Sequence, residues 1–341
     1  MQNKLNDFQI LPDEQGKIVE SGWATKLLFN YQPRNIKLER MKIKEWDSYI
    51  LISSSGEYAF TMHLSDKRSQ GQVSACFYDI KNGRKYDCFN PKFLHGGKIT
   101  LSNTSESGSS VVKGLFCDFM YLINSDDRHL YCKYTKVFDA DIEANLHVTY
   151  DQSAESLAVL LPMNDDNTQF YCNQSVVCMP ASGYVSLDNI KYEFDPENDY
   201  AMLDWGRGVW NDKCRRVFCT GSSNVNGKPF GFNIGYGLGK TESASENAFF
   251  YDNKCYKLDK VYINYPFLGS EKVCTVKSND KRFEMQIEPI YCCENEHDLS
   301  VVRQHEKIMF GRMSGTAITD DGEKLEIKDL ICYFEQSTGK Y

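Results

Sequence analysis

The heptapeptide DWGRGVW, residues 204–210, gathers the residue types of this chain that could do chemistry. Asp204 is a carboxylate that could hold or move a proton, and Arg207 could pair with it through charge-assisted hydrogen bonds. Trp205 and Trp210, two of the four tryptophans in the chain, could enclose that pair in an apolar wall. Desolvation by indoles and attraction by a guanidinium would then set the pKa of the acid, as they do in catalytic pockets. The cluster predicts a pocket whose acid is Asp204.

The same cluster also has a structural interpretation. Its two glycines permit a bend or a close backbone approach. Arg207 could therefore tie loop carbonyls together while the indoles fill the end of a barrel. A desolvated Asp–Arg pair that loses one partner is strongly destabilised, so Asp204→Asn would lower the melting temperature in this case and would mainly lower turnover in the other. The residues alone leave both interpretations open.

The segments around the cluster have the pattern of short strands joined by tight turns. Polar and apolar residues alternate on both sides of the Ser-Ser-Gly turn that ends at Gly56. The same pattern surrounds four further turn sequences, which are Asn82-Gly83, Asp252-Asn253, Asn279-Asp280 and Asp321-Gly322. No long window has a capped amphipathic helix, although LSVVRQHEKIMF, residues 299–310, is expected to form a short helical turn before its strand. The pattern predicts an all-β fold of antiparallel barrels or sandwiches.

The length of the chain and an interruption of its alternating pattern by Pro and Gly predict two domains. A chain of 341 residues exceeds what one small core needs. Pro180 and Gly183 interrupt the pattern, and a new alternating run follows them. We expect an N-terminal extension over residues 1–20, a first β domain over 21–180, and a second β domain over 181–341 that carries DWGRGVW.

Composition excludes several partners and compartments. The net charge is −8 and no run of Lys and Arg offers a phosphate-binding surface, so nucleic acid is not an expected partner. The longest apolar run, residues 157–163, is too short to cross a bilayer, and the first residues lack the apolar stretch of a signal peptide. We therefore expect a cytoplasmic protein without a membrane span. The thirteen cysteines are odd in number and scattered, which predicts reduced thiols.

Neither a metal nor a cofactor is expected. The six histidines and the cysteines show no metal-ligand spacing. GYGLGKT, residues 235–241, ends like a phosphate-binding loop, but Ile234 stands where its first glycine is required and no helix pattern follows. It predicts a glycine-rich strand end. SNTSESGSS, residues 102–110, predicts a polar hairpin loop or a mobile lid.

Four blocks of the sequence resemble the hallmark blocks of the domain of unknown function 2804 (DUF2804) family. They are KEWDSYILISSSGEYAFTMHLSD, MPASGYVSLDNIKYEFDP, LDWGRGVW and GFNIGYGLGKTESASENAFFYDNKCYKL, in this order, and the match covers nearly the whole chain. The family is similar, more distantly, to proteins with two consecutive lipocalin-like (calycin-type) barrels, among them carotenoid hydratases and natural-product cyclases. The resemblance implies that fold, and implies a pocket position for Asp204. It also singles out SEN, residues 245–247, which offers Glu246 and Asn247.

The chain departs from the family pattern directly after DWGRGVW. It reads NDKCRRVFCTGSS where further tryptophans are expected, which implies a thinner aromatic lining of the pocket. The departure bears on ligand identity more than on fold.

Three function classes follow from these observations. The first is an acid–base enzyme of the hydratase, isomerase or cyclase type, in which Asp204 or Glu246 exchanges a proton with an apolar small molecule. The second is a non-catalytic carrier of a lipid or another hydrophobic ligand. The third is a carbohydrate-active enzyme with paired carboxylates and stacking indoles. The first is preferred because a buried Asp beside Arg is costly in a passive carrier. The residues assigned to ligand binding are Trp205, Arg207, Trp210 and Asn247.

Overall fold

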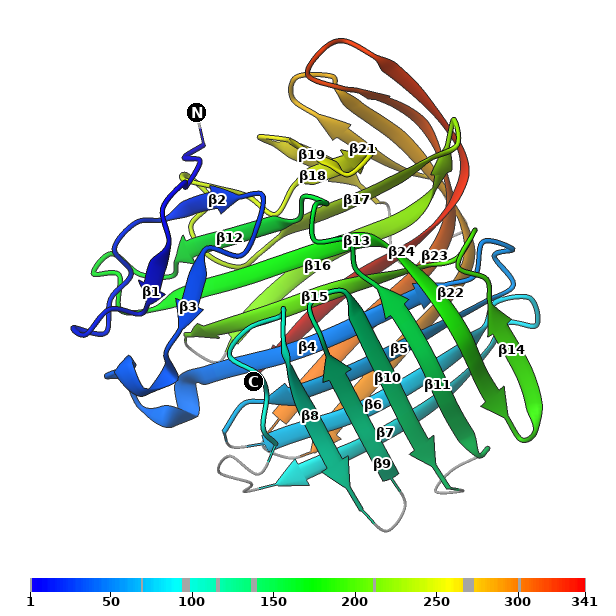
Figure 1. Cartoon of the computed structure of the whole chain (residues 1–341), viewed down its shortest axis with the longest axis horizontal. Helices are drawn as coiled ribbons and strands as arrows, with labels where there is room; N and C mark the ends of the chain where they lie inside the picture. The colour runs from blue at the N-terminus through cyan, green and yellow to red at the C-terminus, as the bar shows by residue number, and fades with distance from the viewer. Residues whose placement is uncertain are drawn as a thin grey trace.

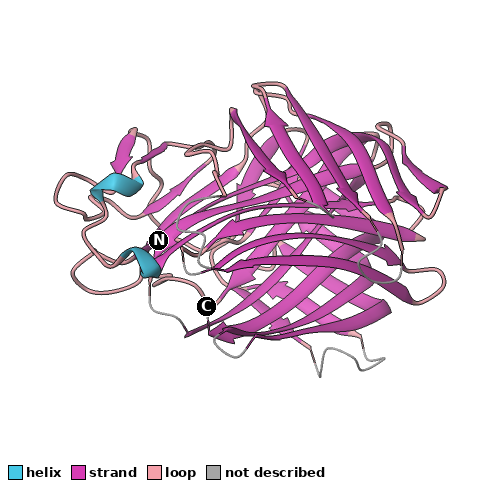
Figure 2. Cartoon of the chain, turned by 90° about the horizontal axis from the view of Figure 1, so that it is seen from below, coloured by secondary structure: helices cyan, strands magenta, loops and turns pink. Residues whose placement is uncertain are grey.

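The structure is a computed structural model that describes residues 2–68, 70–93, 99–114, 117–135, 140–210, 213–265, 273–299 and 302–340. In these ranges the only helical elements are two short 3-10 turns, Pro33–Asn35 (η1) and Arg40–Lys42 (η2), and strands dominate the rest (Figure 2). The all-β prediction is confirmed. No helix in the described ranges is long and apolar enough to cross a membrane.

The first sheet is antiparallel and contains thirteen strands within the described residues. Its strands are β2 (Gly22–Ala24), β4 (Ile43–Ile52), β5 (Tyr58–Asp66), β6 (Gln70–Asp79), β7 (Arg84–Phe93), β8 (Gly108–Lys113), β9 (Cys117–Ile123), β10 (Asp127–Tyr134), β11 (Ile142–Thr149), β12 (Leu157–Pro162), β13 (Phe170–Leu187), β14 (Ile190–Phe194) and β15 (Tyr200–Val209). The main order is β7-β6-β5-β4-β15-β13-β11-β10-β9-β8. Two further short strands, β1 (Gln9–Leu11) and β3 (Phe29–Tyr31), form a separate parallel pair.

The second sheet is also antiparallel and contains nine strands in the part of the chain that the structure describes. They are β16 (Lys213–Val225), β17 (Lys228–Tyr236), β18 (Ala248–Tyr251), β19 (Lys254–Lys257), β20 (Val261–Asn264), β21 (Cys274–Ser278), β22 (Phe283–Leu299), β23 (Val302–Ile318) and β24 (Lys324–Lys340). Their order is β19-β18-β17-β16-β24-β23-β22-β21-β20. Both sheets curl into half-barrels that lie against each other (Figure 1).

The turn chemistry predicted the hairpins correctly. The turn ending at Gly56 joins β4 to β5, and the other four turn sequences join β6 to β7, β18 to β19, β21 to β22 and β23 to β24. The helical turn expected at 299–310 is wrong for the residues that the structure describes. Residues from Val302 onward belong to β23, which pairs with both β22 and β24, so this ladder overrides the local pattern.

The strand that carries DWGRGVW lies in the first sheet, whereas we expected it in a second β domain over residues 181–341. β15 pairs with β4 on one side and β13 on the other (Figure 1). The junction expected near Pro180 falls inside the long strand β13, which has a bulge between Val176 and Met179 and a positive φ of 103° at Gly183. Pro180 and Gly183 therefore mark a bend within one strand and not a domain junction. The chain passes to the second sheet only after β15.

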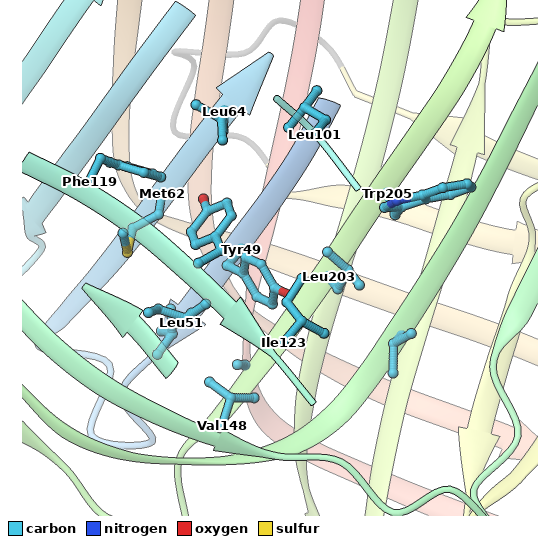
Figure 3. Packing of buried hydrophobic residues seen from close by; sticks show 14 of the residues in the cluster. Tyr49, Leu51, Met62, Leu64, Leu101, Phe119, Ile123, Val148, Leu203 and Trp205 are labelled. Carbon is cyan, nitrogen blue, oxygen red and sulfur yellow. The ribbon is translucent and has the colours of Figure 1, made fainter. Parts of the chain in front are cut away.

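Both faces of β15 are covered, which is why all ten of its residues are buried. Its inner face contributes Leu203 and Trp205 to a core that the curled first sheet encloses together with Tyr49 and Phe119 (Figure 3). Its outer face contributes Met202 to a second apolar cluster, which joins the two sheets. β15 therefore separates two interiors.

Candidate functional site

A cavity of about 160 Å³ lies between the two sheets. A row of residues in register across neighbouring strands of the first sheet forms one wall: Asp204 lies opposite Ser48, Ser48 opposite His63, and His63 opposite Ser74. These four residues all line the cavity. Because neighbouring strands share one pleat, one in-register row presents all four side chains to the same side of the sheet.

Two rows of the second sheet form the facing wall. Arg216 lies opposite Ser337, which lies opposite Glu306 on the next strand. In the second row, Phe218 lies opposite Glu335. All five residues line the cavity. Ionisable groups from strands far apart in the chain therefore meet across one cavity.

Asp204 is held by a ring of donors. Arg216 binds it through both guanidinium nitrogens, with Nη1 at 2.6 Å from Oδ2 and Nη2 at 3.0 Å from Oδ1. The amide of Asn173 donates to Oδ1 at 2.6 Å and the indole Nε1 of Trp46 donates to Oδ2 at 3.0 Å. Burial would raise the pKa of Asp204, but the Arg216 charge and these hydrogen bonds hold the pKa below its ordinary value. Asp204 is a fixed anion at neutral pH.

Glu246 stands behind Arg216, away from the cavity wall. Its Oε1 accepts hydrogen bonds from Arg216 Nη2 at 3.1 Å and from the Tyr171 hydroxyl at 2.6 Å. Its Oε2 is buried and has no hydrogen-bond partner among the described residues. The neighbouring Asn247 accepts a hydrogen bond from the backbone N–H of Gly235 at 3.1 Å, which ties the SEN block to β17. Arg216 thus connects Glu246 to Asp204.

Three aromatic rings surround the Asp204–Arg216 pair. Trp46 stacks on Tyr171 with ring centroids 5.9 Å apart, and Trp210 meets both rings edge-on at 6.0 Å. Trp46 and Trp210 also line the cavity. The predicted indole wall exists, but its second indole comes from β4 and not from residue 205.

Arg207 does not pair with Asp204, contrary to our expectation. Positions three apart on a strand point to opposite faces, and Arg207 points into the first half-barrel. There it forms an ion pair with Asp47 at 2.8 Å and donates to the carbonyl of Ser102 at 2.6 Å. Its guanidinium lies 4.3 Å from the ring centroid of Trp205. The motif therefore serves two separate clusters, one on each face of β15.

Glu335 is the carboxyl group of the cavity best suited to exchange a proton. The Tyr333 hydroxyl donates to its Oε2 at 2.7 Å. Burial, followed by the negative charge of Glu306, raises the pKa of Glu335 to about 7. A carboxyl group in this state can give or take a proton near neutral pH.

Two further titratable groups enter from the first sheet. His63 Nδ1 lies 2.6 Å from Ser48 Oγ, and burial lowers the pKa of His63 to about 3, so the imidazole is neutral. Burial also lowers the pKa of Lys67, at the same wall, to about 8. The cavity thus combines a neutral imidazole, an ammonium group and a protonatable carboxyl group.

Among the described residues, no group of three or more His, Cys, Asp or Glu side chains is arranged to hold an ion. Residues 235–241 form the end of β17 and a turn with positive φ at Gly237 and Gly239, as expected for a glycine-rich strand end.

Of the six residues predicted for the site, Asp204 and Trp210 line the cavity, and Glu246 reaches it only through Arg216. Trp205 and Arg207 occupy the other interior, and Asn247 braces backbone. Sequence reasoning missed the partners that other strands supply, which are Trp46, His63, Arg216 and Glu335. Trp46 and His63 lie in the KEWDSY…TMHLSD block, and Arg216 lies in the NDKCRRV segment that departs from the family pattern. A family block and a departure from the family pattern therefore both pointed to segments that supply cavity residues.

Comparison with known proteins supports the architecture. A family model described as a domain of unknown function (DUF2804) matches residues 2–341. No curated protein matches the sequence. The solved structure of CghA with Sch210972 superposes with a TM-score of 0.53 at 10% identity, covering 88% of each chain. A putative AttH from Nitrosomonas europaea superposes with a TM-score of 0.51 at 11% identity, covering 88% of this chain and 93% of that one. These likenesses show a lipocalin-like fold with two consecutive barrels.

A third solved structure is more distant. Kievitone hydratase from Nectria haematococca superposes with a TM-score of 0.47 at 8% identity, covering 87% of this chain and 88% of that one.

Proposed function

Because the chain belongs to the family of the domain of unknown function 2804, which comes with no assigned activity, we propose a function from the cavity itself. The cavity binds a small molecule with an apolar framework and catalyses proton transfer on it, as a hydratase, isomerase or cyclase does. The observation that carries this proposal is Glu335, a half-buried carboxyl group on the cavity wall whose pKa of about 7 lets it act as acid or base.

In this proposal Asp204 and Glu246 position Arg216 and do not themselves move the proton. Both carboxylates bind the guanidinium, and Asp204 has a lowered pKa, which makes it a poor proton donor. A guanidinium held on two sides keeps its orientation while charge develops on a ligand. Arg216 would stabilise an oxyanion or enolate formed in the cavity, opposite the row of His63 and Ser48.

Apolar residues support the expected character of the ligand. Ile50 and Met62 of the first sheet and Phe218, Leu238 and Ile308 around the second line the same cavity. Such walls bind an apolar framework and keep water from the reacting atoms. The polar rows then contact a small number of functional groups on the ligand.

A carbohydrate-active enzyme is the second candidate. Glu306 and Glu335 lie in neighbouring rows of adjacent strands, and the charge of Glu306 contributes to the raised pKa of Glu335. Two neighbouring carboxyl groups beside the indoles of Trp46 and Trp210 are also what glycoside hydrolysis uses. The passive carrier gains no support from such a costly set of buried charges.

Native mass spectrometry of gently purified protein tests the proposal. We expect a co-purified molecule with an apolar framework and few polar groups, whereas a retained sugar would favour the second candidate. With that molecule as substrate, Glu335→Gln should lower turnover by roughly 100-fold or more while retaining binding. A Glu335→Gln variant that turns the molecule over as fast as wild type would overturn the catalytic part.

We also propose that the two half-barrels are separate domains and that the protein works in the cytoplasm. The two large apolar clusters support the first statement, since each is built by one sheet. The thirteen cysteines, none of which forms a disulfide in the described structure, support the second because thiols persist in reducing compartments.

A further inference from the structure

Trp205 and Arg207 of the motif have no part in the cavity between the sheets. They lie on the inner face of β15, inside the first half-barrel, where Arg207 binds Asp47 and the carbonyl of Ser102. Arg207 is completely buried. The interior that the motif enters on this side therefore contains a desolvated guanidinium as well as apolar side chains.

A second guanidinium in this interior is poorly satisfied. Arg128 of β10 is only 1% exposed. Its Nη2 donates to the carbonyl of Ser105 at 3.2 Å, its Nη1 contacts the thioether sulfur of Met179 at 2.7 Å, and its Nε has no hydrogen-bond partner in the described structure. A thioether is a weak acceptor. A buried guanidinium with one carbonyl as its strong acceptor is costly, and a carboxylate is the group that would satisfy its fork.

Other donors nearby are also unsatisfied. The hydroxyl groups of Tyr49 and Tyr121 and the indole Nε1 of Trp205 are buried without a hydrogen-bond partner among the described residues. The rings of Tyr49 and Tyr121 are 5.0 Å apart, and Tyr49 and Trp205 belong to one cluster (Figure 3). Arg128 acts electrostatically on both Tyr49 and Asp47, which places its charge in the same neighbourhood. Four donors without a hydrogen-bond partner among the described residues are therefore collected in this interior, beside the carboxylate of Asp47.

Segment 99–107 of the chain covers this interior. Ile99 and Leu101 belong to the apolar core, in which Figure 3 shows Leu101 among the aromatic and aliphatic side chains. The Ser105 hydroxyl donates to the side chain of Gln174. The backbone carbonyl of Ser102 accepts from one buried arginine, and that of Ser105 accepts from the other. The segment forms loop and no strand. Its two carbonyls therefore contact the buried guanidinium groups, and its two aliphatic side chains fill the apolar space beside them.

We propose that the interior of the first half-barrel, beneath segment 99–107, is a second binding site, for a small apolar molecule that carries one carboxylate. The carboxylate binds the Arg128 fork in place of the Ser105 carbonyl, and the apolar body replaces Ile99 and Leu101. Asp47 already forms an ion pair with Arg207 at 2.8 Å, so Arg128 is the guanidinium left for an incoming carboxylate, and a single negative charge fits this interior better than a dianion. Binding opens the segment, which is the cover of the site.

Binding of a dansyl-labelled undecanoate to the full chain tests this site, with decanoate and decanol as competitors. We expect saturable binding that decanoate displaces and decanol does not. Arg128→Met replaces the charged side chain with an apolar one of similar length and so removes the unsatisfied charge. The variant should therefore fold, and it should bind the probe at least tenfold more weakly than wild type. Leu101→Gly loosens the cover and should bind the probe at least as tightly as wild type.

Glu335→Gln separates this site from the cavity between the sheets. The substitution removes a titrating carboxyl group from that cavity, so an anionic probe that bound in the cavity would bind Glu335→Gln more tightly than wild type. Because we place the probe in the first half-barrel, we expect its affinity for Glu335→Gln to equal its affinity for wild type. The inference is overturned if Arg128→Met binds like wild type, if decanol competes as well as decanoate, or if neither wild type nor Leu101→Gly shows saturable binding. Each outcome leaves the proposed chemistry at Glu335 unaffected.

Discussion

The indole of Trp46 lies directly over Gly206. A Cβ atom added to Gly206 would come within 2.1 Å of ring atoms Cε2 and Cζ2 of Trp46. The absence of that atom lets the indole cross the strand and donate to Asp204. A Cβ atom added to Gly208 would lie 2.4 Å from the backbone carbonyl oxygen of Phe170 and 2.7 Å from Cζ3 of Trp210, so this glycine makes room for both. The glycines of DWGRGVW thus admit the two indoles that wall the cavity.

Gly206→Ala should lower the free energy of unfolding by about 1–3 kcal/mol, because the new methyl group must displace a packed ring or the strand itself. Urea denaturation of wild type and variant measures the change. In a Trp46→Ala background the same substitution should cost much less, because the clashing ring is gone. Equal costs in both backgrounds would show that the contact with Trp46 is not their source.

Asp204→Asn should destabilise the protein by about 3–5 kcal/mol at neutral pH, because Arg216 loses its bidentate partner in a buried setting. The folded protein lowers the pKa of Asp204, so this stabilisation is present above the unfolded pKa of about 3.9 and disappears as pH falls through the folded value. Urea melts at a series of pH values should therefore show a gap between wild type and variant that narrows in acid.

Asp165→Asn is the matched control for that substitution. Asp165 pairs with Lys240, but its side chain is 98% exposed, and exposed ion pairs contribute little. If Asp204→Asn melts like Asp165→Asn at neutral pH, the Asp204–Arg216 pair is not a structural tie.

Glu335→Gln should change the pH dependence of stability in the opposite sense. The pKa of Glu335 is about 7 in the folded protein and that of an unfolded glutamate is about 4.3. Between these values the folded state binds more protons, so the stability of wild type falls as pH rises. The variant does not titrate, and its stability relative to wild type should rise from about pH 4 to about pH 7 and then level off. Glu326→Gln, on the same strand but exposed, should show no such trend.

The cysteines should react slowly in the native protein and completely in denaturant. Most of the thirteen are buried, and burial raises the pKa of the Cys178 and Cys255 thiols to about 12, which suppresses the reactive thiolate. A thiol reagent should therefore label few sites in native protein and nearly all thirteen in denaturant without reductant. Recovery of a single thiol in denaturant would contradict the assignment to a reducing compartment.

The hairpins could be predicted from sequence because their causes are local. Asn82-Gly83 and Asp321-Gly322 place residues that tolerate positive φ between alternating runs, and a tight turn brings adjacent strands into register without help from the rest of the chain. The pocket position of Asp204 was predicted because it is a carboxylate flanked by indoles and because the family resemblance implies that position. Residues 302–310 show the limit, since a helical pattern there yielded to pairing with the strands on both sides.

The sequence by itself determined the antiparallel hairpins, the all-β class and the family, because each depends on neighbouring residues or on motifs in a fixed order. Only the tertiary structure decided the partners of Asp204. Trp46 lies 158 residues away in the chain, and sheet order alone brings β4 beside β15. Arg207, three residues away, faces the opposite interior because successive side chains of a strand alternate between faces, so Arg216 of β16 became the partner.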